Sequence, residues 1–202
     1  MRMAGPDVVL FIVGALLFGG ALTAIIVTQG PGAFTGTAGS PSGLYSVTWT
    51  TASGTPKSLQ VSDFTGGSVK GSVNGTNVDK VTVSVTCSDP ASAAVPFAIS
   101  VNVDGPNNLK GKGSGNCGDK IEVVVKVQDV PGPTSASGST PEAAASSLPA
   151  NPNATAGVGD WTITFSGSRG PTGALPVPAP GPSGTISLVA ETFSPKLDPV
   201  AK

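Results

Sequence analysis

An apolar run near the N-terminus most strongly restricts what this chain can fold into. The run extends from Val8 to Val27, twenty residues without a charged side chain. As a helix rising about 1.5 Å per residue, it spans about 30 Å, the thickness of the hydrocarbon core of a bilayer. The apolar regions of signal peptides are shorter, at about 7 to 15 residues. The sequence therefore predicts a transmembrane helix over residues 8–28.

The charges before this helix predict its orientation. Residues 1–7 contain the amino group, Arg2 and Asp7, a small positive bias that favours retention of this end in the cytoplasm. We therefore expect a single-pass protein of the cell membrane, with a short cytoplasmic N-terminus and a C-terminal domain outside the cytoplasm. The bilayer is its first predicted partner. Cleavage by a signal peptidase near residues 28–30, which would release a secreted domain, stays open as an alternative.

Small residues in the predicted helix suggest a helical partner. Ala15 and Gly19 are four residues apart, as are Gly20 and Ala24, and this spacing lets a second helix approach closely. The alternative is that glycine is common in membrane helices generally. The predicted partners are another surface or membrane protein, or a second copy through the helix.

After the helix, the sequence changes to a flexible segment and then to strands. Residues 29–43 are rich in glycine and proline and predict a stalk. From residue 44 onward, apolar and polar residues alternate with the period of two that is typical of half-buried strands. The alternation covers residues 45–49, 57–64, 81–87, 97–103, 121–127, 161–165 and 186–190, with a short candidate around Val69. Because these segments are short and joined by turn residues, we predict an all-β ectodomain over residues 44–194, a seven- or eight-stranded antiparallel Ig-like or jelly-roll sandwich.

Three segments lack this alternation. Residues 131–158 are poor in large apolar side chains and are predicted to form a long surface loop or disordered insertion. Residues 167–184 hold five prolines and predict an extended loop. Residues 195–202 are expected to form a C-terminal tail.

Cys87 and Cys117 are the only cysteines in the sequence. An even pair in an exported chain predicts a disulfide rather than a metal or redox site, with two unpaired thiols as the alternative.

The remaining composition offers little catalytic chemistry. The chain has no histidine, which removes the usual general base and the commonest metal ligand. A serine–lysine pair stays formally possible, but no spacing singles one out. Beyond residue 7, ten lysines and arginines are scattered among eleven carboxylates, so no basic surface for nucleic acid is expected. We predict a protein that is not an enzyme, with no catalytic residue, metal, cofactor or nucleic-acid partner.

Several motifs have two interpretations. Residues 104–108 (DGPNN) could supply oxygen ligands to calcium, but a turn needs the same residue types. Residues 113–118 (GSGNCG) are predicted to form a turn, because the lysine and helix of a phosphate-binding loop are missing. Trp49 and Trp161 fall on apolar strand faces, which favours core packing over ligand binding. Asn74 and Asn153 each begin an Asn-X-Thr pattern for N-glycosylation, a pattern that also arises by chance.

The order of membrane helix, Gly/Ser/Thr/Pro stalk and Thr-rich sandwich with few charges resembles the surface proteins of archaea, including type IV pilin-like subunits and accessory proteins of the archaellum. Residues 159–165 (GDWTITF), followed by a loop and a final strand, are similar to the end of the jelly-roll domains appended to secreted peptidases. In those peptidase families the sandwich assists stability or binding without catalysis of its own, so this second resemblance implies a non-catalytic role. Pro6 and the lack of a glutamate after it depart from the pilin precursor pattern.

Two functions of different classes follow as hypotheses. The first is a membrane-anchored extracytoplasmic protein with a structural or binding role at the cell surface or in a membrane assembly. The second is a pilin-like subunit of an extracellular filament. The first predicts a retained N-terminal helix, and the second predicts trimming near Pro6 and polymers.

Overall fold

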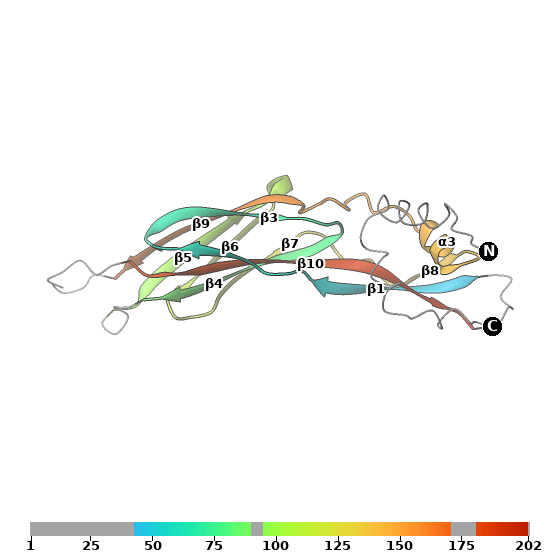
Figure 1. Cartoon of the computed structure of the whole chain (residues 1–202), viewed down its shortest axis with the longest axis horizontal. Helices are drawn as coiled ribbons and strands as arrows, with labels where there is room; N and C mark the ends of the chain where they lie inside the picture. Colours follow the sequence, from blue (N-terminus) through green and yellow to red (C-terminus); the bar gives the residue numbers. More distant parts are fainter. Residues whose placement is uncertain (1–42, 90–94, 171–180, 202) are drawn as a thin grey trace, which may run out of the picture. The chain divides into compact units, whose positions relative to one another are not determined.

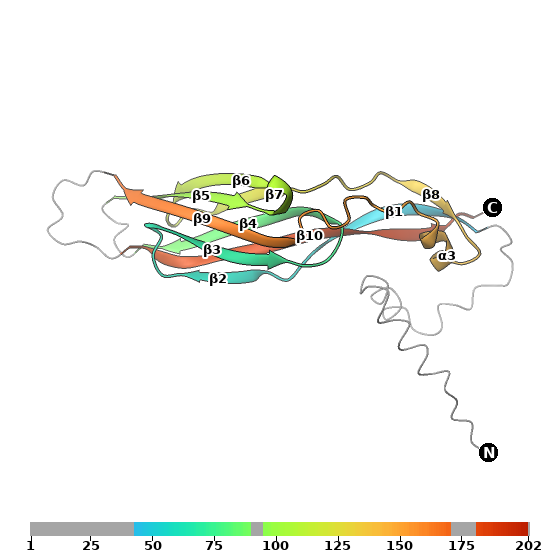
Figure 2. The same ribbon diagram turned by 90° about the horizontal axis from the view of Figure 1, so that it is seen from above.

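The computed structural model of the chain describes residues 43–89, 95–170 and 181–201. The predicted transmembrane helix over residues 8–28 and residues 29–42 of the predicted stalk lie outside these ranges. The described part folds into two antiparallel β-sheets that face each other (Figures 1 and 2). This confirms the predicted all-β sandwich.

The first sheet has six strands and the second has four. The first contains β1 (Leu44–Ser53), β2 (Lys57–Val61), β4 (Val78–Ser88), β7 (Ile121–Lys126), β8 (Thr134–Ser137) and β10 (Ser183–Pro199). Its order is β7-β4-β10-β1-β8, with β2 also paired to β10. The second has the order β3-β9-β5-β6 and contains β3 (Gly66–Val73), β9 (Gly159–Arg169), β5 (Phe97–Asp104) and β6 (Lys110–Asn116). Two short helices, η1 (Pro106–Asn108) and α3 (Pro141–Ser146), complete the described part.

The core lies between the two sheets and follows the alternation of the sequence. In β5, for example, Phe97, Ile99, Val101 and Val103 are each at most 3% exposed, while the residues between them face outward. Burial of a valine, isoleucine or phenylalanine side chain stabilises a fold by about 1.5 to 3 kcal/mol. This free energy therefore favours the pairing register that turns the apolar face of each strand toward the core.

Ten strands form within the described residues, where the sequence predicted seven or eight, and β6 was not among the predicted strands. Residues 113–118 were predicted to form a turn, but residues up to Asn116 belong to this strand. Its inward positions are the glycines 111, 113 and 115, so it shows no apolar alternation. A Cβ atom added at Gly113 would lie 2.7 Å from Cγ2 of Val123 in β7. The missing side chains thus let the edges of the two sheets approach each other.

Filling this glycine face is expected to destabilise the sandwich. Gly113→Val should lower the free energy of unfolding by about 1 to 3 kcal/mol, because overpacked cores are displaced or strained. Lys112→Val is the matched control, since Lys112 is exposed on the opposite face of the same strand. Urea unfolding of both variants measures the difference, and equal stabilities would contradict the close packing of β6 on β7.

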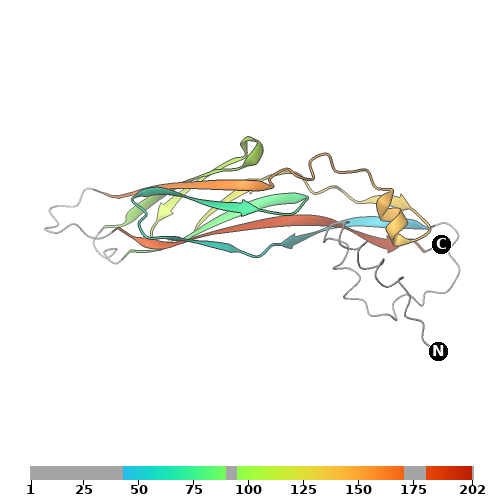
Figure 3. The ribbon, with the colours of Figure 1, turned by 45° about the horizontal axis from the view of Figure 1, so that its top comes forward.

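Strand β10 connects the sandwich to a narrower part that we call the stem, formed by residues 193–199 of β10 with β1, β8 and α3 (Figure 3). The first half of β10 pairs with β4, and its second half pairs with β1. The buried positions change from Ile186 and Leu188 to Phe193. Because successive side chains point to opposite faces, the stem buries the other face of this strand. The predicted tail over residues 195–202 is corrected, since the strand continues to Pro199.

The segment 131–158 is not a disordered insertion, because it contains β8 and α3. The hydroxyl of Thr140 accepts a hydrogen bond from the backbone N–H of Ala143 at 3.2 Å, and Pro141 occupies the first helical turn. Both are recognised helix-start signals. A second hydrophobic cluster joins this segment to β1 and consists of Tyr45, Val47, Ala136 and Ala144. Ala136 and Ala144 therefore pack in this cluster although the segment has few large apolar side chains.

The disulfide between Cys87 and Cys117 is confirmed, with the two Cα atoms 5.1 Å apart. Cys87 lies in β4 of the first sheet, and Cys117 directly follows β6 of the second. The backbone N–H of Cys117 also donates to the carbonyl of Phe97 at 2.8 Å. The bridge therefore joins the two sheets covalently.

Removal of this bridge is expected to destabilise the protein. Closing a loop with a sequence separation of 30 residues contributes about 3.6 kcal/mol in the chain-entropy model. We expect the double variant Cys87→Ala/Cys117→Ala to lose that amount in urea unfolding, with the m-value reporting any change in the unfolded ensemble. The oxidised wild type run beside its reduced form is the control, and equal midpoints for the two forms would contradict the prediction.

Candidate functional site

The outward face of the second sheet carries an array of small polar side chains. In β5, the inward residues Ile99 and Val101 leave Ser100 between them on the outer face. The strand register places Ser100 opposite Ser114 of β6 on one side and opposite Ser166 of β9 on the other. Three hydroxyl groups thus form a row across three strands.

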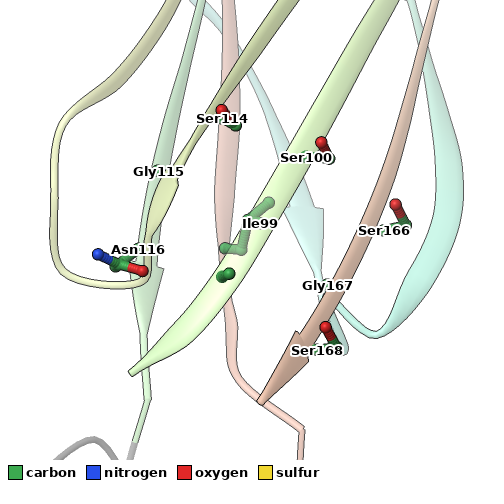
Figure 4. Close-up of a pocket in the computed structure, with 9 residues that line it drawn as sticks. Ile99, Ser100, Ser114, Gly115, Asn116, Ser166, Gly167 and Ser168 are labelled. Atoms are coloured by element: carbon green, nitrogen blue, oxygen red, sulfur yellow. The ribbon is translucent and has the colours of Figure 1, made fainter. Parts of the chain in front are cut away.

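A shallow depression of about 400 Å³ lies on this row. Figure 4 shows the hydroxyl groups of Ser100, Ser114, Ser166 and Ser168 standing on the strands around it. The lining residues are Ala98, Ile99, Ser100, Ser114, Gly115, Asn116, Ser166, Gly167 and Ser168. We call this depression the hydroxyl pocket.

The chemistry of the hydroxyl pocket is that of neutral hydrogen bonding. Each serine hydroxyl can donate one hydrogen bond and accept two, and the amide of Asn116 offers both functions. The lining residues include no acidic, basic or aromatic side chain. A serine nucleophile requires an adjacent base, and no lining residue supplies one. The arrangement is suited to holding an uncharged, hydroxyl- or amide-bearing surface.

A buried ion pair borders the pocket at the end of the sandwich away from the stem. The guanidinium of Arg169 donates to both carboxylate oxygens of Asp89, at 2.5 and 2.8 Å. The side chain of Asp89 is 0% exposed and that of Arg169 is 15% exposed. The guanidinium carbon of Arg169 also lies over the ring of Phe97, 5.6 Å from the ring centroid. Since Asp89 follows β4 and Arg169 ends β9, the pair links the two sheets, as the disulfide does.

A second charged pair lies at the other end of the sandwich. The ammonium group of Lys126 donates a hydrogen bond to the carboxylate of Asp79, which is 5% exposed. This hydrogen bond raises the pKa of Lys126 above its ordinary value. The pair joins β7 to β4 within one sheet and has a structural role.

The prediction that the tryptophans pack in the core is confirmed for Trp161, whereas Trp49 is only partly buried. Trp161 is 0% exposed, and its Nε1 donates to the carbonyl of Gly157 at 2.9 Å. Trp49 is only partly buried in the stem and meets Phe193 edge to face, with ring centroids 5.7 Å apart. Its Nε1 is buried without a hydrogen-bond partner among the described residues. Neither side chain is an exposed platform for a ligand.

The remaining predicted sites are distributed over the chain. Within residues 104–108, Asp104 ends β5 and Pro106–Asn108 form η1 in the connection to β6. The carboxylate of Asp104 lies 3.8 Å from the ammonium group of Lys110. Within the described ranges, no group of three or more acidic, cysteine or histidine side chains is placed to hold a metal. Asn74 and Asn153 are both exposed. The helix-packing residues Ala15, Gly19, Gly20 and Ala24 lie outside the described residues.

The sequence interpretation missed the hydroxyl pocket and the Asp89–Arg169 pair. The alternation of β5 and β9 predicts outward hydroxyls, but only the strand register brings them into one row. No local pattern pairs Asp89 with Arg169, which are 80 residues apart. Among the helices of the described residues, none has the length and apolar character needed to cross a membrane.

No family model and no curated protein sequence matches the chain. Among solved structures, it is similar to a chain in the cryo-EM structure of a semi-empty virus-like particle of the giant freshwater prawn Macrobrachium rosenbergii nodavirus. The identity is 11% and the TM-score 0.39, over 77% of this chain and 87% of that chain. A TM-score this low carries no inference about function.

Proposed function

We propose that this protein is a single-pass, membrane-anchored extracytoplasmic module with a structural or binding role at the cell surface or in a membrane assembly. The observation that carries the proposal is the disulfide between Cys87 and Cys117. Disulfides persist in oxidising compartments outside the cytoplasm and are rare within it. The predicted membrane helix over residues 8–28 supplies the anchor.

The start of the described domain supports a role in which the anchored stem presents the hydroxyl pocket to a partner. Gly43 and Leu44 lie at the start of the stem. The backbone N–H of Gly138 donates to the carbonyl of Gly43, and the backbone N–H of Val200 donates to the carbonyl of Leu44. Gly43, the last residue of the predicted stalk, is therefore held against the stem. The hydroxyl pocket lies on β5, β6 and β9, beyond the junction with the stem. The neutral hydroxyl groups of the hydroxyl pocket favour binding to an uncharged polar surface.

Fractionation of native cells tests this proposal. We expect the protein in the membrane fraction after a high-salt wash, released only by detergent, beginning at or next to Met1, with a two-proton mass increase on reduction. Recovery from the cytosol with two free thiols would overturn the proposal. Sheared extracellular polymers that begin near Pro6 would replace it with the pilin-like filament, and a soluble form that begins near Pro31 would replace it with a secreted domain.

A matched pair of variants sharpens the test of the anchor. Leu16→Arg/Leu17→Arg places two charges at the centre of the predicted helix, where each costs about 2.5 to 3.5 kcal/mol of insertion free energy. We expect this variant to lose membrane retention. Thr35→Arg/Thr37→Arg adds the same charge to the predicted stalk and should stay in the membrane fraction.

A further inference from the structure

Two turns that are far apart in the sequence meet at the junction between the sandwich and the stem. One is the turn between β3 and β4, residues 74–77, and the other spans residues 151–158 before β9. The backbone N–H of Asn77 donates to the carbonyl of Ala154 at 2.7 Å. The side chain of Asn151 donates to Oδ1 of Asn77 at 2.8 Å. The two turns therefore form one surface, which we call the junction turns.

Each junction turn carries an Asn-X-Thr pattern. These patterns are Asn74-Gly75-Thr76 and Asn153-Ala154-Thr155. The asparagine and threonine of each pattern are all exposed. The hydrogen bond from Asn77 to Ala154 joins the residue that directly follows the first pattern to the middle residue of the second. The tertiary structure thus places the two patterns next to each other, although their asparagines are 79 positions apart by number.

The second turn is anchored through neighbours of Asn153 rather than through its side chain. Asn151 accepts a hydrogen bond from the backbone N–H of Asn153 at 2.9 Å and donates to Gln128 at 3.0 Å. Gln128 in turn donates to the carbonyl of Val78 at 3.0 Å. The fold thus holds the backbone of the turn in place while the Asn153 side chain stays accessible.

We infer that the junction turns form a paired N-glycosylation site, with one glycan on Asn74 and one on Asn153. The inference rests on the proposed export of the domain, because the donor is a sugar linked through phosphate to a membrane lipid. The side-chain amide nitrogen of each asparagine forms a bond to the anomeric carbon of that sugar. The bond from this carbon to the phosphate oxygen breaks, the lipid phosphate leaves, and the amide loses one proton.

The placement of the pair has a consequence for binding. Asn74 follows the end of β3 that pairs with Gly159, at the start of β9, whereas Ser166 and Ser168 of the hydroxyl pocket lie near the other end of β9. Glycans on the junction turns would therefore cover the junction and leave the hydroxyl pocket open. The proposed binding face and the proposed sugars do not compete.

Intact mass of the full chain, purified from its native membranes with and without reductant, tests the inference. We expect two glycan increments on the wild type. Asn74→Gln and Thr155→Ala should each remove one increment, and the two combined should remove both. Thr76→Ser and Thr155→Ser keep the acceptor pattern and should keep both increments, which separates loss of the pattern from loss of the fold.

The other outcomes are distinguishable. An unmodified chain in the membrane fraction with an intact disulfide would overturn the glycan pair while leaving the proposed function in place. A single increment would overturn the pairing. An unmodified cytosolic chain with free thiols would overturn both the pair and the proposed function.

Discussion

Replacing Arg169 with alanine is expected to lower the free energy of unfolding by about 3 to 5 kcal/mol, because it leaves the carboxylate of Asp89 buried without the guanidinium. That carboxylate is 0% exposed and receives two hydrogen bonds from Arg169. The ring of Phe97 loses its cation contact in the same variant. Urea unfolding followed by circular dichroism measures the loss.

Two controls separate a buried charge from a general loss of packing. The double variant Asp89→Leu/Arg169→Met removes both charges and should regain most of the lost stability, since apolar replacements of buried pairs are often neutral. Lys196→Ala breaks the pair of Lys196 with Asp198, whose side chains are 61% and 53% exposed. This change should cost at most about 1 kcal/mol. An Arg169→Ala variant as stable as Lys196→Ala would refute the inter-sheet ion pair.

Replacing Trp161 with alanine is expected to cost about 3 to 5 kcal/mol, the range measured for large aromatic side chains in cores. Trp161 is 0% exposed within the main cluster, and its Nε1 satisfies the carbonyl of Gly157. The variant therefore loses apolar contacts, leaves a cavity and removes a buried hydrogen bond. Thermal unfolding of the purified ectodomain beside the full chain would measure the shift and also establish whether residues 43–202 fold alone.

The other tryptophan provides a matched comparison. Trp161→Phe deletes a satisfied buried N–H, whereas Trp49→Phe deletes one that has no partner among the described residues. Removal of an unsatisfied buried donor relieves a desolvation penalty of about 1 to 3 kcal/mol. We therefore expect Trp49→Phe to be nearly neutral and Trp161→Phe to be clearly destabilising. Equal losses would mean that ring volume alone decides both sites.

Strands with an apolar face could be predicted from the sequence, and strands without one could not. In β4, Val81, Val83 and Val85 alternate with threonine and serine, and in β7 the inward residues Ile121, Val123 and Val125 recur at every second position, so a period of two predicts both strands. The inward residues of β6 are glycines, whose role depends on the side chains of β7 across the sandwich. A period-two search finds no apolar side chain there, because the space is filled from the other sheet.

The same reason explains the segment 131–158. Its composition lacks the large side chains that usually drive packing, and the interpretation as disordered followed from that. Ala136 and Ala144 are nevertheless buried, because Tyr45 and Val47 of β1 supply the bulk of the second cluster. Thr140 and Pro141 provide a local signal for the start of α3 in a segment whose composition alone indicates a loop.

Local period and residue counts are enough to predict the all-β class, the apolar faces of most strands and the disulfide between Cys87 and Cys117, and they also predict a membrane helix. The contacts across the sandwich could not be predicted in this way, because they arise from the arrangement of the strands in space. The tertiary structure joined Asp89 to Arg169, aligned Ser100 with Ser114 and Ser166, and brought Asn77 to Ala154. Such contacts depend on strand order and register, which are set by the packing of the whole core rather than by any one segment.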